Sequence, residues 1–280
     1  MSASLLFAGD RQVDAIAPDD RALAYGDGLF ETMRVHAGTL PWWEAHWSRL
    51  VRGGERLHMA LPRPERVRAE AARLFDDGAD GVLKLLVSRA GGARGYAPPV
   101  DGQVRWMIAR HALPPEAPST GVRAIWCDIR MAVQPALAGI KHCNRLEQVL
   151  ARGECVAAGV DEGLMQDVDG CVVSATSANL FVLRDGAWLT PRVDRCGVAG
   201  TCRAQLLQVL EAREATLDVA AVDAAEAVFL CNAVRGILPL ARLGTRQWSP
   251  HAAIATARRA LAGLHPGFAP GLGRRAPEAG

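Results

Sequence analysis

A proline-rich segment near the middle of the chain is the feature that most constrains its fold. Residues 111–121 read HALPPEAPSTG, a composition that favours neither a helix nor a strand and is typical of a linker. The regions on both sides mix strand-like and helix-like patterns, and a chain of 280 residues is long enough for two modest domains. We therefore expect an α/β protein with an N-terminal domain (1–110), a linker (111–121), a C-terminal domain (122–267) and a loose tail (268–280).

The N-terminal region predicts short strands around a helical segment. Apolar runs bounded by turn residues predict strands over 4–8, 11–16, 29–35, 81–88 and 103–109. Helical spacing begins at Trp43 and recurs over 65–75, but the Gly53-Gly54 pair predicts a break, since glycine destabilises a helix interior. The Gly/Pro-rich segment 89–102 is long enough to be a functional loop.

The C-terminal region continues the mixed pattern. Strands are predicted over 122–130, 171–173, 179–183, 187–190 and 227–231. A helix over 144–158 carries apolar or small residues in one stripe, at 146, 149, 150, 153, 156 and 157. Asn144 and Glu147 resemble a capping pair, which places the helix start just after Lys141. A second helix is predicted over 201–212.

Charge and hydropathy exclude several classes of protein. The 32 basic and 30 acidic side chains leave a formal net charge of +2, so we expect no nucleic-acid partner. No apolar run approaches the roughly 18 residues of a membrane-spanning helix, and the apolar start lacks the basic leader of a secretory signal. We therefore expect a cytoplasmic protein that does not associate with membranes.

Cysteine and histidine usage gives no support for a metal centre. Seven cysteines are an odd number without a C-x-x-C pair, which argues against a disulfide framework and a zinc knuckle. We expect most of them to be small buried side chains. The seven histidines are dispersed and match no catalytic triad motif.

Only two of the 32 basic residues are lysines, so chemistry that needs a side-chain amine has two candidates. Lys84 lies in the middle of an alternating strand, where a lysine usually faces solvent. Lys141 stands where a Pro/Gly-containing stretch meets a helix, a position that can direct an amine into a cavity. To be a free base near neutral pH, its pKa must fall by about 3 units from ~10.4, which requires burial or a bound cofactor. A lone lysine at such a position is more often structural.

Anion-binding residues are suggested by two segments. Gly197 and Gly200 precede a helix that begins at Thr201, and a helix N-terminus attracts anions. Taken alone, this segment is better explained as an ordinary glycine-containing loop with a threonine cap. Arg49 could reach a phosphate or carboxylate, and Arg89 and Arg94 lie in the glycine-rich loop. No P-loop or G-x-G-x-x-G motif is present, which argues against a nucleoside triphosphate or a dinucleotide.

Taken together, these segments resemble one family. The matching stretches are DRALAYGDGLFETMRV (20–35), EAHWSRL (44–50), GVLKLLVSRAGGARGY (81–96), LAGIKHCNRLEQVLAR (137–152), DEGLMQD (161–167), SANLFVLRDGAWLTP (177–191) and CGVAGTCR (196–203). They resemble the 4-amino-4-deoxychorismate lyases, which belong to the class IV (fold type IV) pyridoxal-phosphate enzymes together with branched-chain and D-amino-acid aminotransferases. IKHCNRLEQVLAR is the most lyase-like run, whereas YGDGLFE is shared by the whole class.

The resemblance implies a fold, a cofactor and a set of residue roles. The fold would be the two-domain α/β fold of D-amino-acid aminotransferases, with mixed sheets, flanking helices and a homodimer. Lys141 matches the lysine that forms the Schiff base with pyridoxal 5'-phosphate and then shuttles protons. Arg49 matches the phosphate-binding arginine, and Val198 the apolar residue packed on the cofactor ring. The remaining matches are Thr201 and Cys202 (backbone amides to the phosphate), Thr32 (a proton-handling hydroxyl), and Arg94, Tyr96 and Tyr25 (the substrate side).

One position departs from the family pattern. The class usually has a glutamate five residues before the asparagine of the NLF strand, where it keeps the pyridine nitrogen protonated. Counting back from Asn179 gives Ser174. A serine cannot hold that proton as a carboxylate does, so the hypothesis is that Ser174 leaves the nitrogen largely unprotonated and favours elimination over transamination.

The resemblance implies conversion of 4-amino-4-deoxychorismate to 4-aminobenzoate and pyruvate for folate synthesis. Two alternatives stay open at the sequence level. One is a class IV aminotransferase for branched-chain or D-amino acids, and the other is a cofactor-free binding or scaffold protein that has kept the fold.

Overall fold

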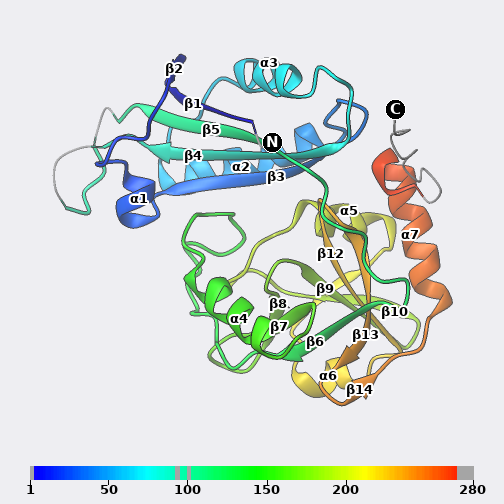
Figure 1. Cartoon of the computed structure of the whole chain (residues 1–280). Helices are drawn as coiled ribbons and strands as arrows, with labels where there is room; N and C mark the ends of the chain where they lie inside the picture. Colours follow the sequence, from blue (N-terminus) through cyan, green and yellow to red (C-terminus); the bar gives the residue numbers. More distant parts are fainter. Residues whose placement is uncertain (1–2, 92–94, 100–101, 270–280) are drawn as a thin grey trace.

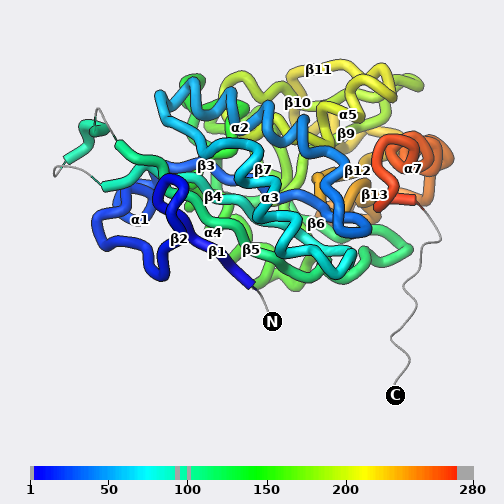
Figure 2. Tube along the Cα trace, turned by 90° about the horizontal axis from the view of Figure 1, so that it is seen from above, coloured from blue at the N-terminus to red at the C-terminus, as the bar shows by residue number. Residues whose placement is uncertain are grey.

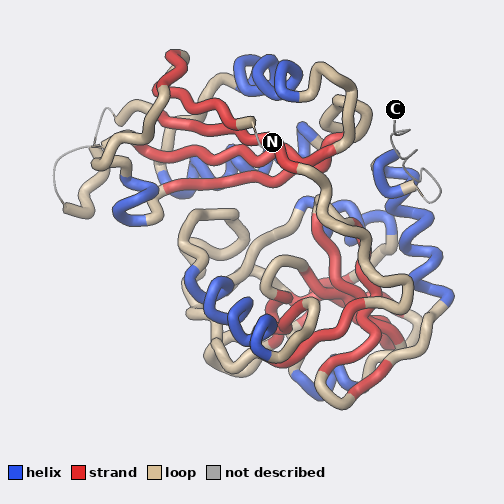
Figure 3. Tube along the Cα trace, in the orientation of Figure 1, coloured by secondary structure: helices blue, strands red, loops and turns tan. Residues whose placement is uncertain are grey.

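The computed structural model describes residues 3–91, 95–99 and 102–269, which form two β-sheets with helices packed around them (Figure 1). Strands up to His111 form a five-stranded sheet in the order β2-β1-β5-β4-β3, and strands from Val122 onward form a nine-stranded sheet. Residues 112–121 join the two sheets without regular structure (Figure 3). The division of the chain into domains at this segment stays a prediction.

The first sheet is entirely antiparallel. Its strands are β1 (Ser4–Ala8), β2 (Arg11–Val13), β3 (Gly28–Val35), β4 (Gly81–Arg89) and β5 (Val104–His111), and its helices are α1 (Arg21–Tyr25), α2 (Trp43–Leu57) and α3 (Pro64–Leu74). Helices α2 and α3 cover one face, seen from above in Figure 2. Because side chains alternate along a strand, Leu29 and Met33 of β3 pack into the core beneath these helices, and Phe30 and Thr32 point to the other, half-buried face.

The second sheet is mixed and curled. Its strands follow the order β11-β10-β9-β12-β13-β6-β7-β8, with β14 beside β13. The strands are β6 (Val122–Trp126), β7 (Glu162–Gln166), β8 (Val172–Ala175), β9 (Asn179–Arg184), β10 (Ala187–Pro191), β11 (Arg213–Ala215), β12 (Ala227–Asn232), β13 (Gly236–Leu243) and β14 (Arg246–Gln247). The helices are α4 (Leu146–Ala157), α5 (Thr201–Val209), α6 (Val219–Asp223), α7 (Ala252–Leu264) and the 3-10 turn η1 (Pro266–Phe268). No helix among the described residues is long and apolar enough to cross a membrane.

The break predicted at Gly53-Gly54 is wrong, because α2 runs unbroken from Trp43 to Leu57. Packing explains the glycines. A Cβ on Gly53 would lie 2.9 Å from Cδ2 of Leu29, and one on Gly54 would lie 3.1 Å from the carbonyl oxygen of Met59. The two glycines therefore let the helix approach the sheet closely, and this contact outweighs their low helix propensity.

The predicted capping pair at the start of α4 is also wrong. The helix begins at Leu146, and its N-cap residue Arg145 makes no side-chain capping bond. Asn144 instead donates to the carbonyl oxygen of Gly26 (3.1 Å), and Glu147 accepts from the backbone of Ala132 (2.8 Å). These tertiary bonds hold residues 141–145 in an irregular segment before the helix.

The tail expected after Gly267 lies outside the described residues from 270 onward. All seven cysteines are free thiols, and five of them are buried, as expected for small apolar side chains.

Candidate active site

Lys141 lies between the two sheets, in the segment that precedes α4. The N–H of Phe30 donates to the carbonyl oxygen of Lys141 (3.0 Å), and the N–H of Cys143 donates to Gly28 (2.9 Å), so the segment continues the edge of the first sheet beyond β3. On its other side, Gly139 pairs with Val198 of the second sheet's glycine loop. The main chain around the lysine is thereby held from both halves of the molecule.

The environment of Lys141 favours an uncharged amine. Burial is the largest cause that lowers the pKa of Lys141 to about 7, and the positive charge of Arg49 lowers it further. Nζ lies 4.3 Å from the centroid of the Phe30 ring. An amine with a pKa near neutral can act both as a nucleophile and as a proton acceptor at physiological pH.

Arg49 is held in a buried ion cluster on the inner face of α2. Its Nε donates to Oε1 of Glu31 (2.8 Å) and Nη2 donates to Oε2 (2.5 Å), while Nδ1 of His46 lies 2.7 Å from Oε2. Burial would raise the pKa of Glu31, but the charge and hydrogen bonds of Arg49 and a hydrogen bond from His46 outweigh it and lower the pKa to about 2. The ionised carboxylate therefore fixes the orientation of the guanidinium.

The N-terminus of α5 lies against this cluster. Nη1 of Arg49 donates to the carbonyl oxygen of Ala199 (3.2 Å), and Oγ1 of Thr201 lies 3.5 Å from Nδ1 of His46. The N-cap residue Gly200 supplies no capping side chain, and a Cβ there would collide with Oδ1 of Asn179. Thr201 and Cys202 are buried in the first turn, where backbone N–H groups have no partner within the helix.

These features fit pyridoxal 5'-phosphate. A buried helix N-terminus without a cap, next to an arginine, is suited to a phosphate group. Nε2 of His46 is buried and has no hydrogen-bond partner among the described residues, which leaves a further polar atom available there. Lys141, with its lowered pKa, supplies the amine that an aldehyde requires. The sequence-predicted residues Lys141, Arg49, Thr201 and Cys202 thus come together in one region.

The two hydroxyl residues of the predicted site occupy different sheets. Thr32 lies on the half-buried face of β3, one residue beyond Glu31 and two beyond Phe30. Ser174 is buried on β8 opposite Met165, and its hydroxyl donates to the carbonyl oxygen of Ala175 (3.0 Å). Val198 is half-buried, and its carbonyl oxygen accepts a hydrogen bond from Nδ2 of Asn179 (2.9 Å), which fixes the glycine loop.

The predicted substrate-side residues form a separate, exposed group. Tyr96 is 85% exposed, and its ring lies 5.4 Å from that of Tyr25. Arg21 joins them, because it donates to the carbonyl oxygens of Gly95, Tyr96 and Ala97. The structure records no bond between this group and Lys141 within the described ranges. Arg94 lies outside the described residues.

The expectation that Lys84 faces solvent is wrong. Lys84 is half-buried on β4 opposite Thr32, and its Nζ lies 5.8 Å from the centroid of the same Phe30 ring that contacts Lys141. The strand alternates as predicted, but the face assigned to solvent is the one turned toward Lys141. Both lysines of the chain therefore lie at one aromatic ring.

Sequence reasoning assigned no role to Glu31, His46 or Arg145, which all lie near Lys141. The sequence contains a pattern that could have pointed to His46 and one that could have pointed to Glu31. His46 precedes Arg49 by one helical turn and so lies on the same face of the helix. Glu31 occupies an inward position of β3, where an unpaired carboxylate would be unfavourable.

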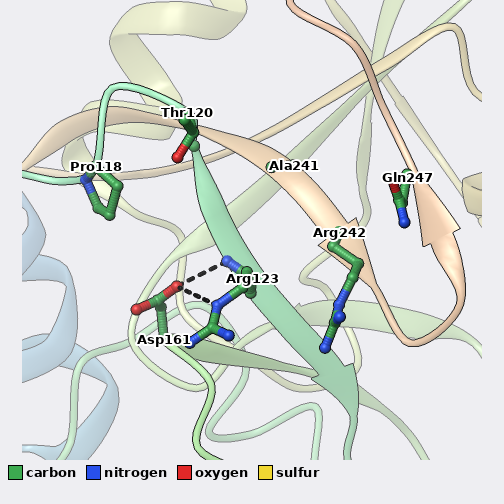
Figure 4. Close-up of a pocket in the computed structure, with 8 residues that line it drawn as sticks. Pro118, Thr120, Arg123, Asp161, Ala241, Arg242 and Gln247 are labelled. Carbon is green, nitrogen blue, oxygen red and sulfur yellow. Dashed lines mark hydrogen bonds and ion pairs between the residues drawn. The ribbon is translucent and has the colours of Figure 1, made fainter.

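A surface cleft elsewhere lacks these properties (Figure 4). It has a volume of about 320 Å³ and lies beside β6 and β13. Asp161 in its wall already accepts a hydrogen bond from the backbone N–H of Arg123 (2.8 Å), and none of the sequence-predicted site residues lines it.

Comparison with known proteins agrees with this description. A family model described as amino-transferase class IV matches residues 28–243. An aminodeoxychorismate lyase of Vibrio harveyi is 35% identical over 79% of this chain and 84% of its own length. The crystal structure of 4-amino-4-deoxychorismate lyase from Pseudomonas aeruginosa has a TM-score of 0.85 and 40% identity, and the match covers 92% of this chain and 98% of that one. A hypothetical aminotransferase from Mycobacterium tuberculosis, solved in a PLP-bound form, has a TM-score of 0.79 at 20% identity, covering 93% and 98%.

Proposed function

The chain belongs to the class IV aminotransferase family, and on that premise we propose that it is a pyridoxal-phosphate-dependent aminodeoxychorismate lyase. Its fold is the fold type IV α/β architecture. The proposed reaction converts 4-amino-4-deoxychorismate to 4-aminobenzoate and pyruvate for folate synthesis. The observation that carries the proposal is the buried Lys141 amine, whose pKa is lowered to about 7, beside an uncapped helix N-terminus and Arg49.

Several residues would hold the cofactor. Arg49, oriented by Glu31, and the backbone N–H groups of Thr201 and Cys202 would bind its phosphate. Val198 would pack on its ring, with Ser174 at the ring nitrogen. When bound, pyridoxal 5'-phosphate supplies an aldehyde for amines and a conjugated ring that withdraws electrons.

Lys141 would carry the proton transfers. Its Nζ would take the proton from the ring carbon that bears the substrate amine, and the electron pair would form the new double bond of the aromatic ring. The bond between the ring and the enolpyruvyl oxygen would break, and that oxygen would keep the bonding pair. A proton delivered to the methylene carbon completes pyruvate. Thr32 would assist through its hydroxyl, because it lies two residues from Phe30 on the face turned toward Lys141.

We also propose that the enzyme is a homodimer and acts in the cytoplasm. The support for a dimer is the outer face of α4, where Leu146, Val149, Leu150 and Val156 are 58 to 77% exposed. The residues that α4 buries within the chain are Ala151 and Cys155, so the apolar stripe is directed away from the core. Gly153 lies within the stripe with open space around its Cβ position, which would allow a second helix to approach.

The test is product analysis with 4-amino-4-deoxychorismate. We expect equal amounts of 4-aminobenzoate and pyruvate from the wild type and neither from Lys141→Ala. A class IV aminotransferase would give a different result, since an amino donor would convert it stoichiometrically to the pyridoxamine form, which then turns over with a keto acid. Absence of both activities in the cofactor-loaded protein would contradict the proposed function.

A further inference from the structure

The surface cleft beside β6 and β13 contains a row of three polar side chains that the proposed function does not use (Figure 4). In the register of the sheet, Arg123 of β6 is the partner of Arg242 of β13, and Arg242 is the partner of Gln247 of β14. Residues paired in this way lie on the same face of a sheet, on strands about 4.8 Å apart. All three residues are exposed and line the cleft, whose volume is about 320 Å³.

The two arginines of this row repel each other. Like charges directly opposite on neighbouring strands are unfavourable, so their pairing here needs an explanation. Asp161 relieves only part of the repulsion, since its Oδ2 accepts from the backbone N–H of Arg123 (2.8 Å) and lies 3.9 Å from Nε of the same residue. Figure 4 shows Asp161 on one side of Arg123 and Arg242 on the other.

The cleft therefore has a surplus of positive charge. Within the described part of the chain, two guanidinium groups and one carboxylate line it. The side chain of Arg242 has no hydrogen bond or ion pair to any described residue. Nη2 of Arg123 donates to the carbonyl oxygen of Gly159 (2.9 Å), which holds this guanidinium in place and directs one of its edges away from the ligand-accessible side. The surplus charge is thus presented on a partly fixed frame.

The turn that precedes β6 forms another wall of the cleft. The N–H of Gly121 donates to the carbonyl oxygen of Pro118 (2.9 Å). Gly121 has a φ of +93°, and a Cβ there would lie 2.8 Å from the carbonyl oxygen of Pro239, so the turn packs closely on β13. This packing places Thr120, which also lines the cleft, next to the arginines. The walls are built into the sheet, and small-molecule sites are usually preformed in this way.

We propose that this cleft binds the phosphate group of a small phosphomonoester. A phosphate between Arg123 and Arg242 would replace their repulsion by two charge-assisted interactions, because a guanidinium group matches the geometry of phosphate oxygens. A phosphomonoester carries a charge of about −1.5 to −2 at neutral pH, which matches two guanidinium groups, whereas a monocarboxylate carries one charge. Gln247, one strand beyond Arg242, would bind a hydroxyl or carbonyl group of the organic part. The inference goes beyond the lyase reaction, since no described residue of the site around Lys141 lines this cleft.

The test is calorimetric titration of glycerol 3-phosphate into the enzyme loaded with pyridoxal 5'-phosphate, whose own phosphate keeps the probe out of the site at α5. We expect Arg123→Met and Arg242→Met each to raise the Kd about 10- to 100-fold, and Arg242→Lys to lose less than Arg242→Met. Arg213→Met is the matched control, because Arg213 is an exposed arginine on β11 of the same sheet, outside the cleft, and its Kd should not change. Absence of binding to the wild type, unchanged binding to both cleft variants, or an equal loss in Arg213→Met would overturn the proposal.

Two further probes test the chemical class of the ligand. Acetate has one negative charge and should bind at least about tenfold more weakly than glycerol 3-phosphate. Inorganic phosphate lacks the organic part, so Gln247→Ala should weaken the binding of glycerol 3-phosphate and leave that of inorganic phosphate unchanged. Acetate that binds as tightly as glycerol 3-phosphate, or a Gln247→Ala variant that binds both phosphates as the wild type does, would overturn the assignment to a phosphomonoester.

Lyase activity separates this cleft from the active site. The Arg242→Met variant should keep the wild-type kcat and KM for 4-amino-4-deoxychorismate and the absorbance of the bound cofactor. Because it breaks no hydrogen bond recorded in the described ranges, its circular dichroism should also match the wild type. A loss of probe binding together with a loss of cofactor would mean that the probe was bound at the active site, and the proposal would fail. The titration itself requires no turnover, so an inactive wild type that still binds the probe through Arg242 would refute the lyase assignment and leave the cleft as a phosphate site.

Discussion

The N–H of Phe30 donates a 3.0 Å hydrogen bond to the carbonyl oxygen of Lys141, so strand β3 holds the peptide that carries the reactive amine. The preceding residue, Ile140, is 4% exposed and packs into the core beneath α2 and α3. The lysine belongs by sequence to the second half of the chain, yet its position is set by the first. Changes in the N-terminal sheet should therefore alter chemistry at Lys141.

The rate at which the cofactor-free enzyme captures pyridoxal 5'-phosphate should depend on the protonation of Lys141. Only the neutral amine attacks an aldehyde, and the pKa of Lys141 is lowered to about 7. Below that pH the rate should rise about tenfold per unit, and it should level off at higher pH. Stopped-flow absorbance measures the capture, with Lys141→Ala as the inactive control. A rate that still climbed up to about pH 10 would indicate an ordinary exposed lysine.

Glu31→Gln should destabilise the protein in a pH-dependent manner. The folded-state pKa of Glu31 is lowered from 4.5 to about 2, so its contribution is present above about pH 4.5 and is lost as the pH falls toward 2. The shift corresponds to about 3 kcal/mol in the free energy of unfolding. Urea unfolding of both proteins should show a gap of this order at neutral pH that narrows in acid. Glu44→Gln on the same helix, where the side chain is 83% exposed, should change little, and an equal stability of Glu31→Gln and wild type would contradict the cluster's role.

Ser174→Glu should shift the enzyme toward transamination. A carboxylate at this buried position would keep the pyridine nitrogen protonated and strengthen the ring as an electron acceptor, whereas the wild-type hydroxyl is bonded to the carbonyl oxygen of Ala175. Single-turnover absorbance with an amino donor should show faster formation of the pyridoxamine form. Ser174→Gln matches the added volume without the charge and should not show this gain. Unchanged lyase and transaminase rates in Ser174→Glu would refute the hypothesis.

Leu150→Glu should dissociate the proposed homodimer. Leu150 is 58% exposed in the apolar stripe of α4, and a buried charge at a dimer contact would be unfavourable. Analytical ultracentrifugation should find the wild type as a dimer and the variant as a monomer. Val168→Glu changes a residue that is 62% exposed but lies outside α4, and it should remain dimeric. A monomeric wild type, or a dimeric Leu150→Glu, would exclude α4 as the contact.

Gly53→Ala should destabilise the N-terminal half even though alanine favours helices. Its Cβ would lie 2.9 Å from Cδ2 of Leu29, an overlap that costs about 1–3 kcal/mol when the neighbour must move. Gly263→Ala in α7 is the matched control, since nothing lies within 4 Å of its Cβ position. Thermal unfolding should show a lower Tm for the first variant only. A Gly53→Ala protein as stable as the wild type would mean that the close approach of α2 is not needed.

The alternating and turn patterns of the sequence were sufficient for many elements. The hairpin of β9 and β10 follows from the Asp185-Gly186 turn, where both residues have positive φ as such a turn requires. Strand β13 and helix α7 were not predicted, because the apolar run of β13 contains Pro239 and α7 is rich in alanine, so neither gives a clear period. The break predicted at Gly53 was wrong because helix propensity is a local property of the sequence. The contact of Gly53 with Leu29, in contrast, joins residues that are far apart in the sequence.

The same distinction between local sequence patterns and tertiary contacts applies to the candidate site. Lys141 could be singled out because lysines are rare in this chain, and the helix beginning at Thr201 because glycines precede it. Alternation along β4 predicts that Lys84 and its immediate neighbours point to opposite faces of the sheet. It does not predict which of the two faces is turned toward Lys141, so the position of Lys84 could not be derived from the sequence. The bonds of Arg145 to the carbonyl oxygens of residues 140 and 142 depend on an irregular backbone that no periodic pattern specifies.

The most direct test of the central claim is borohydride reduction of the cofactor-loaded enzyme followed by peptide mass spectrometry. The account predicts a single phosphopyridoxyl group on Lys141, with the Lys84 peptide unmodified. A label on Lys84 in place of Lys141, or no label on either lysine, would contradict it.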